Sequence, residues 1–140
     1  MQDALKRLQI LMGDTLQILD HMEVDPEHHQ MLQHIKKGLN EENTKIAGFT
    51  NNTVEGRMDK AVSMTIHLNE INNMVQQLEA NLIEDYKKST GNDIKQYEQM
   101  SLEEQWEQTE SYHNKIDYLS AAKIRENLNR MNEVLFSLRT

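Results

Sequence analysis

The chain has 140 residues with one proline, five glycines and no cysteine, and its formal net charge is −8 at pH 7. The lack of cysteine excludes a disulfide framework, a thiol nucleophile and a thiolate metal site, and the negative charge argues against a nucleic-acid partner because it repels phosphate backbones. Apolar residues make up only 37 % of the chain, and with almost no proline to break helices this composition predicts one all-α domain over residues 1–140, an elongated bundle with a thin core.

No stretch of the chain approaches the length of uncharged apolar sequence that a membrane span requires. The first five residues lack the basic and then apolar layout of a secretory signal. We therefore expect no membrane span and a cytoplasmic location. The acidic run from Glu84 to Glu110 is interpreted as a solvated helix surface.

The first predicted helix covers residues 3–22. Its apolar residues recur at spacings of three and four, as expected of a helix that buries one face. Thr15 occupies one position of this stripe, while Leu11, Leu16 and Ile18 widen it. The stripe consists of Leu5, Leu8, Met12, Leu19 and Met22.

The second predicted helix covers residues 26–48. Asp25 can cap it through its side chain and Pro26 suits the first helical position, where no backbone donor is needed. Glu42 interrupts the apolar face, and the polar run from Thr50 to Thr53 favours an end to the helix. The apolar face consists of Leu32, Ile35, Leu39, Ile46 and Phe49.

The third predicted helix, residues 54–88, has the most regular pattern in the chain. A second, flanking stripe of Val62, Ile66, Met74 and Ile83 indicates two neighbouring helices. At the usual rise per residue this helix would extend about 50 Å. Its main stripe consists of Ala61, Met64, Leu68, Ile71, Val75, Leu78 and Leu82.

A short helical segment over residues 93–100 precedes the last predicted helix, residues 102–139. The Ser101–Glu104 run matches the capping box, which predicts the helix start there. The apolar register of the last helix jumps near Ser120, so the helix either bends there or packs each half on a different neighbour. The four predicted helices, two short and two long, form a mainly antiparallel four-helix bundle with coiled-coil-like packing.

The end of the last helix carries apolar residues that predict an interaction surface, for another protein or for a second copy of the chain. Aromatic residues near its start can contribute to that surface, although the same spacing is typical of core residues. The predicted surface residues are Met131, Leu135, Phe136, Leu138, Trp106 and Tyr112.

Two patterns indicate chemistry at histidines. Glu110 and His113 form a Glu-x-x-His pair, the spacing that places two ligands on one face of a metal-binding bundle. His34, Lys37 and Gly38 form a His-x-x-Lys-Gly pattern that resembles the phosphorylation motif of histidine-containing phosphotransfer domains. The resemblance covers five residues and implies phosphorylation of His34, with Lys37 steadying the phosphoryl charge and Gly38 leaving room for a response regulator.

The pattern departs from that family at Lys36, where an apolar residue is usual, and at Leu39, where a small polar residue is usual. Other enzyme signatures, such as a glycine-rich phosphate loop or a nucleophile elbow, are missing from the sequence. We therefore expect a non-enzymatic protein–protein interaction module without a cofactor, such as an adaptor, inhibitor, chaperone or assembly subunit. Phosphotransfer at His34 and metal binding are the two alternatives.

Overall fold

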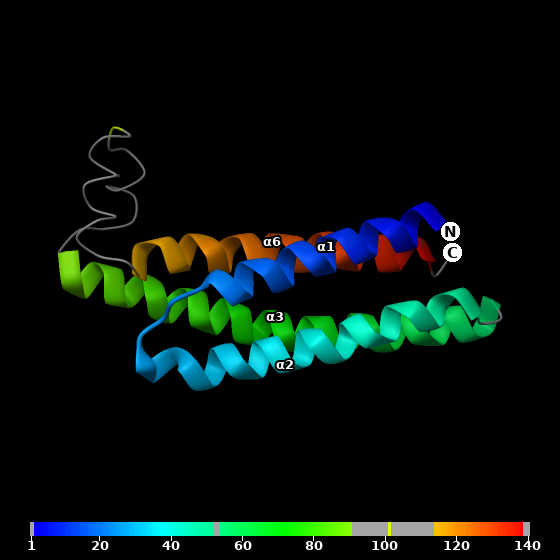
Figure 1. Ribbon diagram of the computed structural model, residues 1–140, viewed down its shortest axis with the longest axis horizontal. Helices are drawn as coiled ribbons and strands as arrows, with labels where there is room; N and C mark the ends of the chain where they lie inside the picture. The colour runs from blue at the N-terminus through cyan, green and yellow to red at the C-terminus, as the bar shows by residue number, and fades with distance from the viewer. Residues whose placement is uncertain (1, 52–53, 91–100, 102–113, 139–140) are drawn as a thin grey trace.

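The computed structural model describes residues 2–51, 54–90, 101 and 114–138. Within these residues the chain forms four α-helices and two short 3₁₀ turns, with no strand (Figure 1). The predicted all-α bundle is confirmed. The elements are α1 (Gln2–His21), η1 (Pro26–His28), α2 (His29–Ile46), η2 (Ala47–Asn51), α3 (Val54–Thr90) and α6 (Asn114–Leu138).

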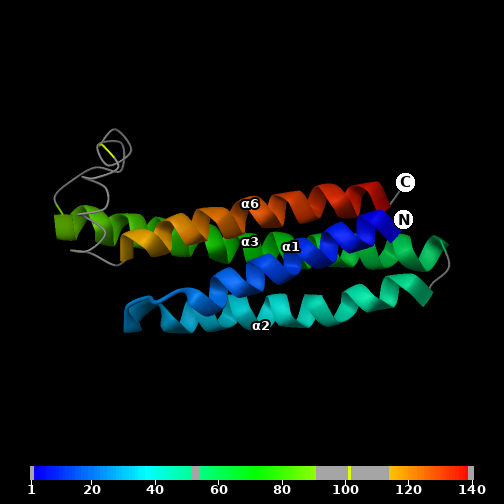
Figure 2. The ribbon, with the colours of Figure 1, turned by 45° about the horizontal axis from the view of Figure 1, so that its top comes forward.

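Consecutive α-helices run in opposite directions, and the four helices form a closed ring. Each helix contacts the next one in the sequence, and α6 returns to contact α1. Helix α1 crosses the bundle obliquely, beginning beside the end of α6 and ending beside the start of α2 (Figures 1 and 2). The ring is therefore not equally tight on all sides, because α1 moves away from α6 along its length.

The corner between α1 and α2 differs in detail from the prediction. The side chain of Asp25 makes no capping hydrogen bond. Instead its backbone carbonyl accepts the N–H of His28 at 2.9 Å, which closes a 3₁₀ turn before α2 begins at His29. Pro26 stands at the predicted first position of that turn, where its missing donor costs nothing.

The predicted stripes of the first three helices form the core. Every main-stripe residue of the 3–22, 26–48 and 54–88 helices is buried, whereas Val62 and Ile66 of the flanking stripe of α3 are exposed and Met74 and Ile83 are half-buried. Helix α3 runs two residues beyond its predicted end, to Thr90. The core therefore lies along the axis of the ring, where one face of each helix points.

Helix α6 is continuous through Ser120, the point of the predicted register jump. Tyr118 is buried and lies three residues before the buried Ala121, so it continues the apolar face that follows Ser120 toward the helix start. Leu119, on the apolar face predicted before Ser120, is exposed. A bend is therefore not needed to explain the jump. The buried residues of α6 are Tyr118, Ala121, Ile124, Asn127, Leu128, Met131, Val134 and Leu135.

The predicted segment 93–100 and the first part of the predicted helix 102–139, up to residue 113, lie outside the described residues. Within the described part of the chain, no helix has the combination of length and hydropathy that spanning a membrane requires.

Candidate functional site

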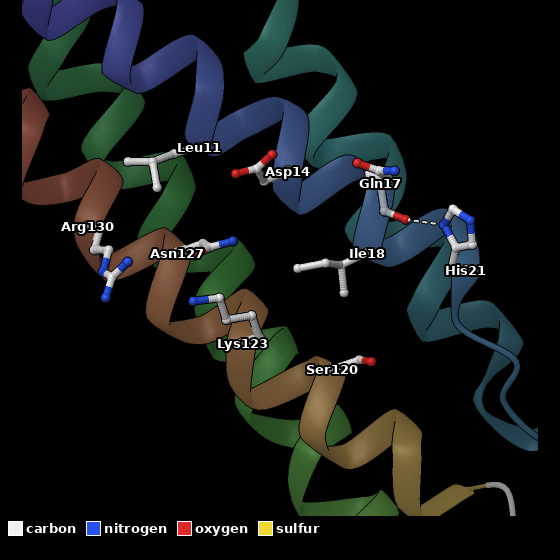
Figure 3. Close-up of a pocket in the computed structure, with 9 residues that line it drawn as sticks. All are labelled: Leu11, Asp14, Gln17, Ile18, His21, Ser120, Lys123, Asn127 and Arg130. Atoms are coloured by element: carbon white, nitrogen blue, oxygen red, sulfur yellow. Dashed lines mark hydrogen bonds between the residues drawn. The ribbon is translucent and has the colours of Figure 1, made fainter.

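A groove runs between α1 and α6 and encloses about 570 Å³ (Figure 3). It lies where α1 moves away from α6, between the second half of α1 and the middle of α6. The wall from α1 consists of Leu11, Asp14, Gln17, Ile18 and His21, and the wall from α6 of Ser120, Lys123, Asn127 and Arg130.

A second hollow of about 380 Å³ continues the groove toward the start of α1. It shares Leu11 and Arg130 with the first and adds Arg7, Ile10 and Glu133. The two hollows together extend over about four turns of α1. This length is suited to an elongated ligand that lies along the two helices.

The floor of the groove combines apolar side chains with a buried polar contact. Leu11 and Ile18 are half-buried and pack against the core, while Ile10 is 55 % exposed. Beneath them the buried Thr15 hydroxyl donates to the Leu11 carbonyl at 2.7 Å and accepts the Asn127 amide at 3.2 Å. Covering the groove would remove apolar surface from water without leaving these polar groups unpaired.

The charges around the groove are mixed, with an excess of cations. Lys123, Arg130 and Arg7 are lining residues, and their acidic counterparts in the lining are Asp14 and Glu133. This surface differs from the chain as a whole, whose formal net charge is −8. It therefore presents cations to a ligand although the molecule is acidic.

An acid beside the groove partly neutralises the cations on α6. Glu126 pairs with Lys123 across 3.8 Å and with Arg130 across 2.5 Å, both within one turn of the helix. All three side chains are about half exposed, so water screens these pairs and they contribute little to stability. Lys123 and Arg130 can therefore release Glu126 and pair with an acidic group of a ligand instead.

The predicted interaction surface at the end of α6 is only partly at the surface. Met131 and Leu135 are fully buried in the core of the chain itself, so their assignment to that surface is wrong. The ring of helices covers them, which sequence periodicity alone does not show. Leu138 is half-buried against the core, and Phe136 is 63 % exposed. Trp106 and Tyr112 lie outside the described residues.

The residues of the phosphotransfer pattern do not lie on one surface of α2. His34 and Lys37 are exposed on α2, as a phosphorylated histidine and its partner must be. Gly38, however, faces α3, and a Cβ built on it would lie 3.0 Å from Cδ1 of Ile71. The glycine thus allows close packing of α2 on α3, a structural reason for it that the sequence pattern did not indicate.

The predicted metal pair Glu110 and His113 lies outside the described residues. The fold instead brings a different set together: Glu27 and His28 of η1 and Asp85 of α3 offer ligand atoms that all lie within 4.8 Å of one another. The sequence contained the adjacent Glu27 and His28, but the pattern gave no sign of a third ligand 57 positions away.

One more polar cluster lies between α2 and α3. The Glu42 carboxylate is only 3 % exposed; its Oε1 lies 2.8 Å from Nδ1 of His67 and 3.0 Å from Nζ of Lys45. The other oxygen, Oε2, is buried and has no hydrogen-bond partner among the described residues. The His67 and Lys45 side chains are each more than two-fifths exposed, so this cluster joins α2 and α3 at a partly solvated position.

Within the described residues, fold and groove together define an elongated all-α bundle of four helices with a surface groove between α1 and α6. Comparisons of the chain with protein-family models, curated proteins and solved structures find no match.

Proposed function

We propose that the chain is a non-enzymatic protein–protein interaction module that binds an amphipathic helix of a partner protein in the α1–α6 groove. The observation that carries this proposal is the groove itself, with its apolar floor at Leu11 and Ile18 and its charged margins. An amphipathic helix laid in an apolar groove is a recurring mode of recognition between proteins. A helix matches the extended shape of the two joined hollows better than a compact small molecule does.

The charges support a particular kind of helix. Its apolar residues would recur at spacings of three and four and rest on Leu11 and Ile18. Acidic residues beside them would meet Arg7, Lys123 and Arg130, in place of the screened pairs with Glu126. A basic helix would meet the lining acids Asp14 and Glu133 but would lose the favourable contacts with these three cations.

Site-specific photocrosslinking in the native cell tests the proposal. A photoreactive amino acid at Gln17, which lines the groove, is expected to form one dominant covalent adduct with a partner protein. The matched control carries the same amino acid at Lys37, an exposed residue of α2 that does not line the groove. Mass spectrometry of the adduct is expected to place the linkage in an acidic amphipathic helix of the partner.

A second variant separates binding from chance proximity. Ile18→Asp places a charge on the apolar floor, so the Gln17 adduct is expected to fall at least tenfold while the far-ultraviolet circular dichroism spectrum stays unchanged. The proposal is wrong if Lys37 yields the same adduct at the same level, or if the adduct persists undiminished in a folded Ile18→Asp variant.

A further inference from the structure

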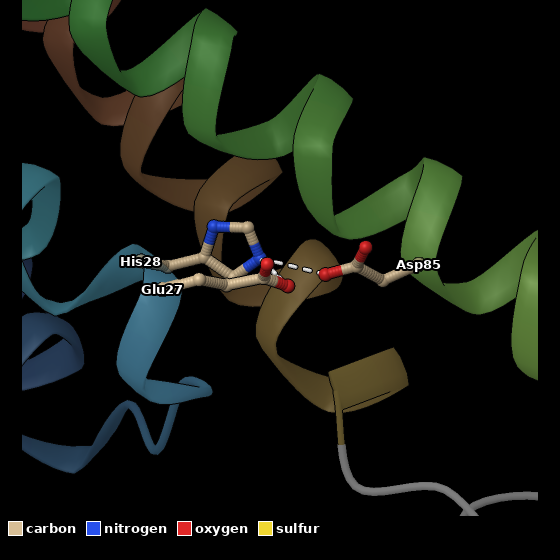
Figure 4. Close-up of side chains that lie close together, drawn as sticks. All are labelled: Glu27, His28 and Asp85. Carbon is tan, nitrogen blue, oxygen red and sulfur yellow. Dashed lines mark hydrogen bonds and ion pairs between the residues drawn. The ribbon is translucent and has the colours of Figure 1, made fainter.

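The buried histidine at the corner between α1 and α2 points at two carboxylates (Figure 4). The His28 side chain is 8 % exposed, and its Nε2 lies 2.6 Å from Oδ2 of Asp85 and 3.4 Å from Oε1 of Glu27. Asp85 is 21 % exposed and Glu27 is on the surface. One imidazole nitrogen and two carboxylate oxygens therefore converge on one point at the edge of the bundle.

Both elements that carry these residues are held in place independently of the cluster. The backbone of η1 is fixed by Pro26 and by the bond from the His28 N–H to the Asp25 carbonyl. Asp85 follows the buried Leu82 by three residues on α3. The neighbouring His29 is engaged elsewhere, with its Nε2 2.9 Å from the Val24 carbonyl. The backbone positions that carry the three ligands are thus fixed before an ion binds, which lowers the cost of binding it.

We propose that Glu27, His28 and Asp85 form a zinc site. The ligands would be His28 Nε2, one oxygen of Asp85 and one oxygen of Glu27, with water in the fourth position. A mixed set of one imidazole and two carboxylates suits zinc, whereas Mg²⁺ and Ca²⁺ favour sites made of oxygen alone. The opening to solvent on the Glu27 side provides the path for the ion.

The two distances from His28 Nε2 can be compared with those of a zinc site. Tetrahedral zinc with bonds of about 2.1 Å keeps its ligand atoms roughly 3.4 Å apart, which is the separation of His28 Nε2 and Glu27 Oε1. The shorter separation from Asp85, 2.6 Å, is that of a hydrogen bond with a proton between nitrogen and oxygen. The Asp85 oxygen therefore moves away by about 0.8 Å when the ion replaces the proton.

The proton balance follows from this exchange. When the imidazole is in its doubly protonated form, zinc binding releases the Nε2 proton to solvent; when it is neutral, the proton moves from Nε2 to Nδ1 and none is released. Bound zinc would tie η1 to α3 and stabilise the folded state over the unfolded one. The site does not depend on the α1–α6 groove, with which it shares no residue.

The test uses the untagged full chain, stripped of metal with a chelator. Added ZnCl₂ is expected to raise the Tm by roughly 5–11 °C when it exceeds its Kd about a hundredfold, and MgCl₂ at the same concentration is expected to leave it unchanged. Co²⁺ is expected to give the intense visible absorption of a tetrahedral site, and calorimetry in two buffers measures how many protons zinc binding releases.

Three variants locate the ion. Asp85→Asn is expected to abolish the zinc-dependent rise in Tm, and Glu27→Gln, at an exposed position, to weaken zinc binding at least tenfold without affecting folding. The matched control is Glu84→Gln, which removes an exposed carboxylate adjacent to Asp85 and outside the cluster, and it is expected to bind zinc as the wild type does. The proposal fails if zinc leaves the Tm of the wild-type chain unchanged, or if Glu27→Gln binds zinc as tightly as Glu84→Gln.

Discussion

At the scale of single residues, the buried carboxylate of Glu42 is a feature that costs stability. It stands where the apolar face of α2 would place a leucine or isoleucine, between Leu39 and Ile46. One of its oxygens has partners in His67 and Lys45, but the other is buried with none among the described residues. The free energy needed to remove a carboxylate from water exceeds the attraction to partners that are partly exposed and therefore screened by water.

We therefore predict that Glu42→Leu stabilises the protein by about 1–3 kcal/mol. The leucine would complete the apolar face of α2, while His67 and Lys45, both substantially exposed, would regain water as a partner. Urea unfolding followed by circular dichroism measures the change. Glu41→Leu, at the exposed neighbouring position, is the control and is expected to alter stability by less than about 0.5 kcal/mol. A loss of stability in Glu42→Leu would mean that the cluster holds α2 on α3.

The sequence identified the irregular residues but not their partners. Thr15 and Glu42 were recognisable as interruptions of apolar stripes because periodicity requires only local spacing. Their partners, Asn127 and His67, lie on other helices, and no local pattern encodes such a pairing. Gly38 shows the same limit: a glycine within a helix lowers helix stability, but its contact with Ile71 depends on how α2 and α3 pack.

At the scale of the helices, the pairing of α1 with α6 includes a polar contact within an apolar seam. Thr15 is bonded both to its own helix, at the Leu11 carbonyl, and to Asn127 of α6. Sliding α1 along α6 by one turn would leave the buried Asn127 amide without this acceptor. The contact therefore favours one register of the two helices that form the groove.

A double-mutant cycle tests this coupling. Thr15→Val leaves the Asn127 amide buried without its acceptor and is expected to cost about 1–2 kcal/mol. When Asn127→Leu is already present, the same change is expected to cost at least about 0.5 kcal/mol less, because no amide is then left unpaired. The free energies of unfolding in urea of the four proteins measure the difference.

Thr65 provides the control for this cycle. Its hydroxyl makes the same type of bond within a helix, to the Ala61 carbonyl at 2.8 Å, and none to Asn127. Thr65→Val and Asn127→Leu are therefore expected to be additive. Additivity of Thr15→Val and Asn127→Leu as well would show that the contact between α1 and α6 carries no coupling.

The helices themselves were largely predictable because each depends on its own spacing of apolar residues. The main stripes of the first three helices predicted the core-facing residues of α1, α2 and α3 correctly. The corner at Asp25 was less predictable, since the backbone carbonyl forms the bond that the side chain was expected to form. The choice between backbone and side chain depends on the turn geometry, which composition does not determine.

At the scale of the whole molecule, the arrangement of the helices could not be predicted from stripes alone. Periodicity tells which face of a helix is buried but not which helix covers it. Thus Met131 and Leu135 were assigned to an exposed surface, although the closed ring buries them. Stripes do not predict the groove for the same reason. Its one signal in the sequence is the width of the apolar stripe of α1, because Leu11 and Ile18 lie beside the residues that pack in the core.

The closed ring predicts that the two walls of the groove are as stable as the core. Each of the four described α-helices packs against two neighbours around one shared core, so removing any one of them exposes apolar surface on the others. Leu68→Ala, at a fully buried residue of α3, is expected to lower stability by about 2–5 kcal/mol. Because the core is shared, α1 and α6 are expected to lose the same stability as α3, rather than α3 alone.

Hydrogen exchange measured by mass spectrometry, with increasing denaturant, separates the helices in this experiment. Peptides from α1, α3 and α6 are expected to show one common midpoint in the wild type and one common, lower midpoint in Leu68→Ala. Leu119→Ala, at a residue of α6 that is 47 % exposed, is the control and is expected to leave the midpoint in place. If α1 exchanged at a lower denaturant concentration than α3, the α1 wall of the groove would unfold separately from the core. A shared midpoint would mean that the groove persists as long as the fold does, so that a partner can bind it without prior unfolding.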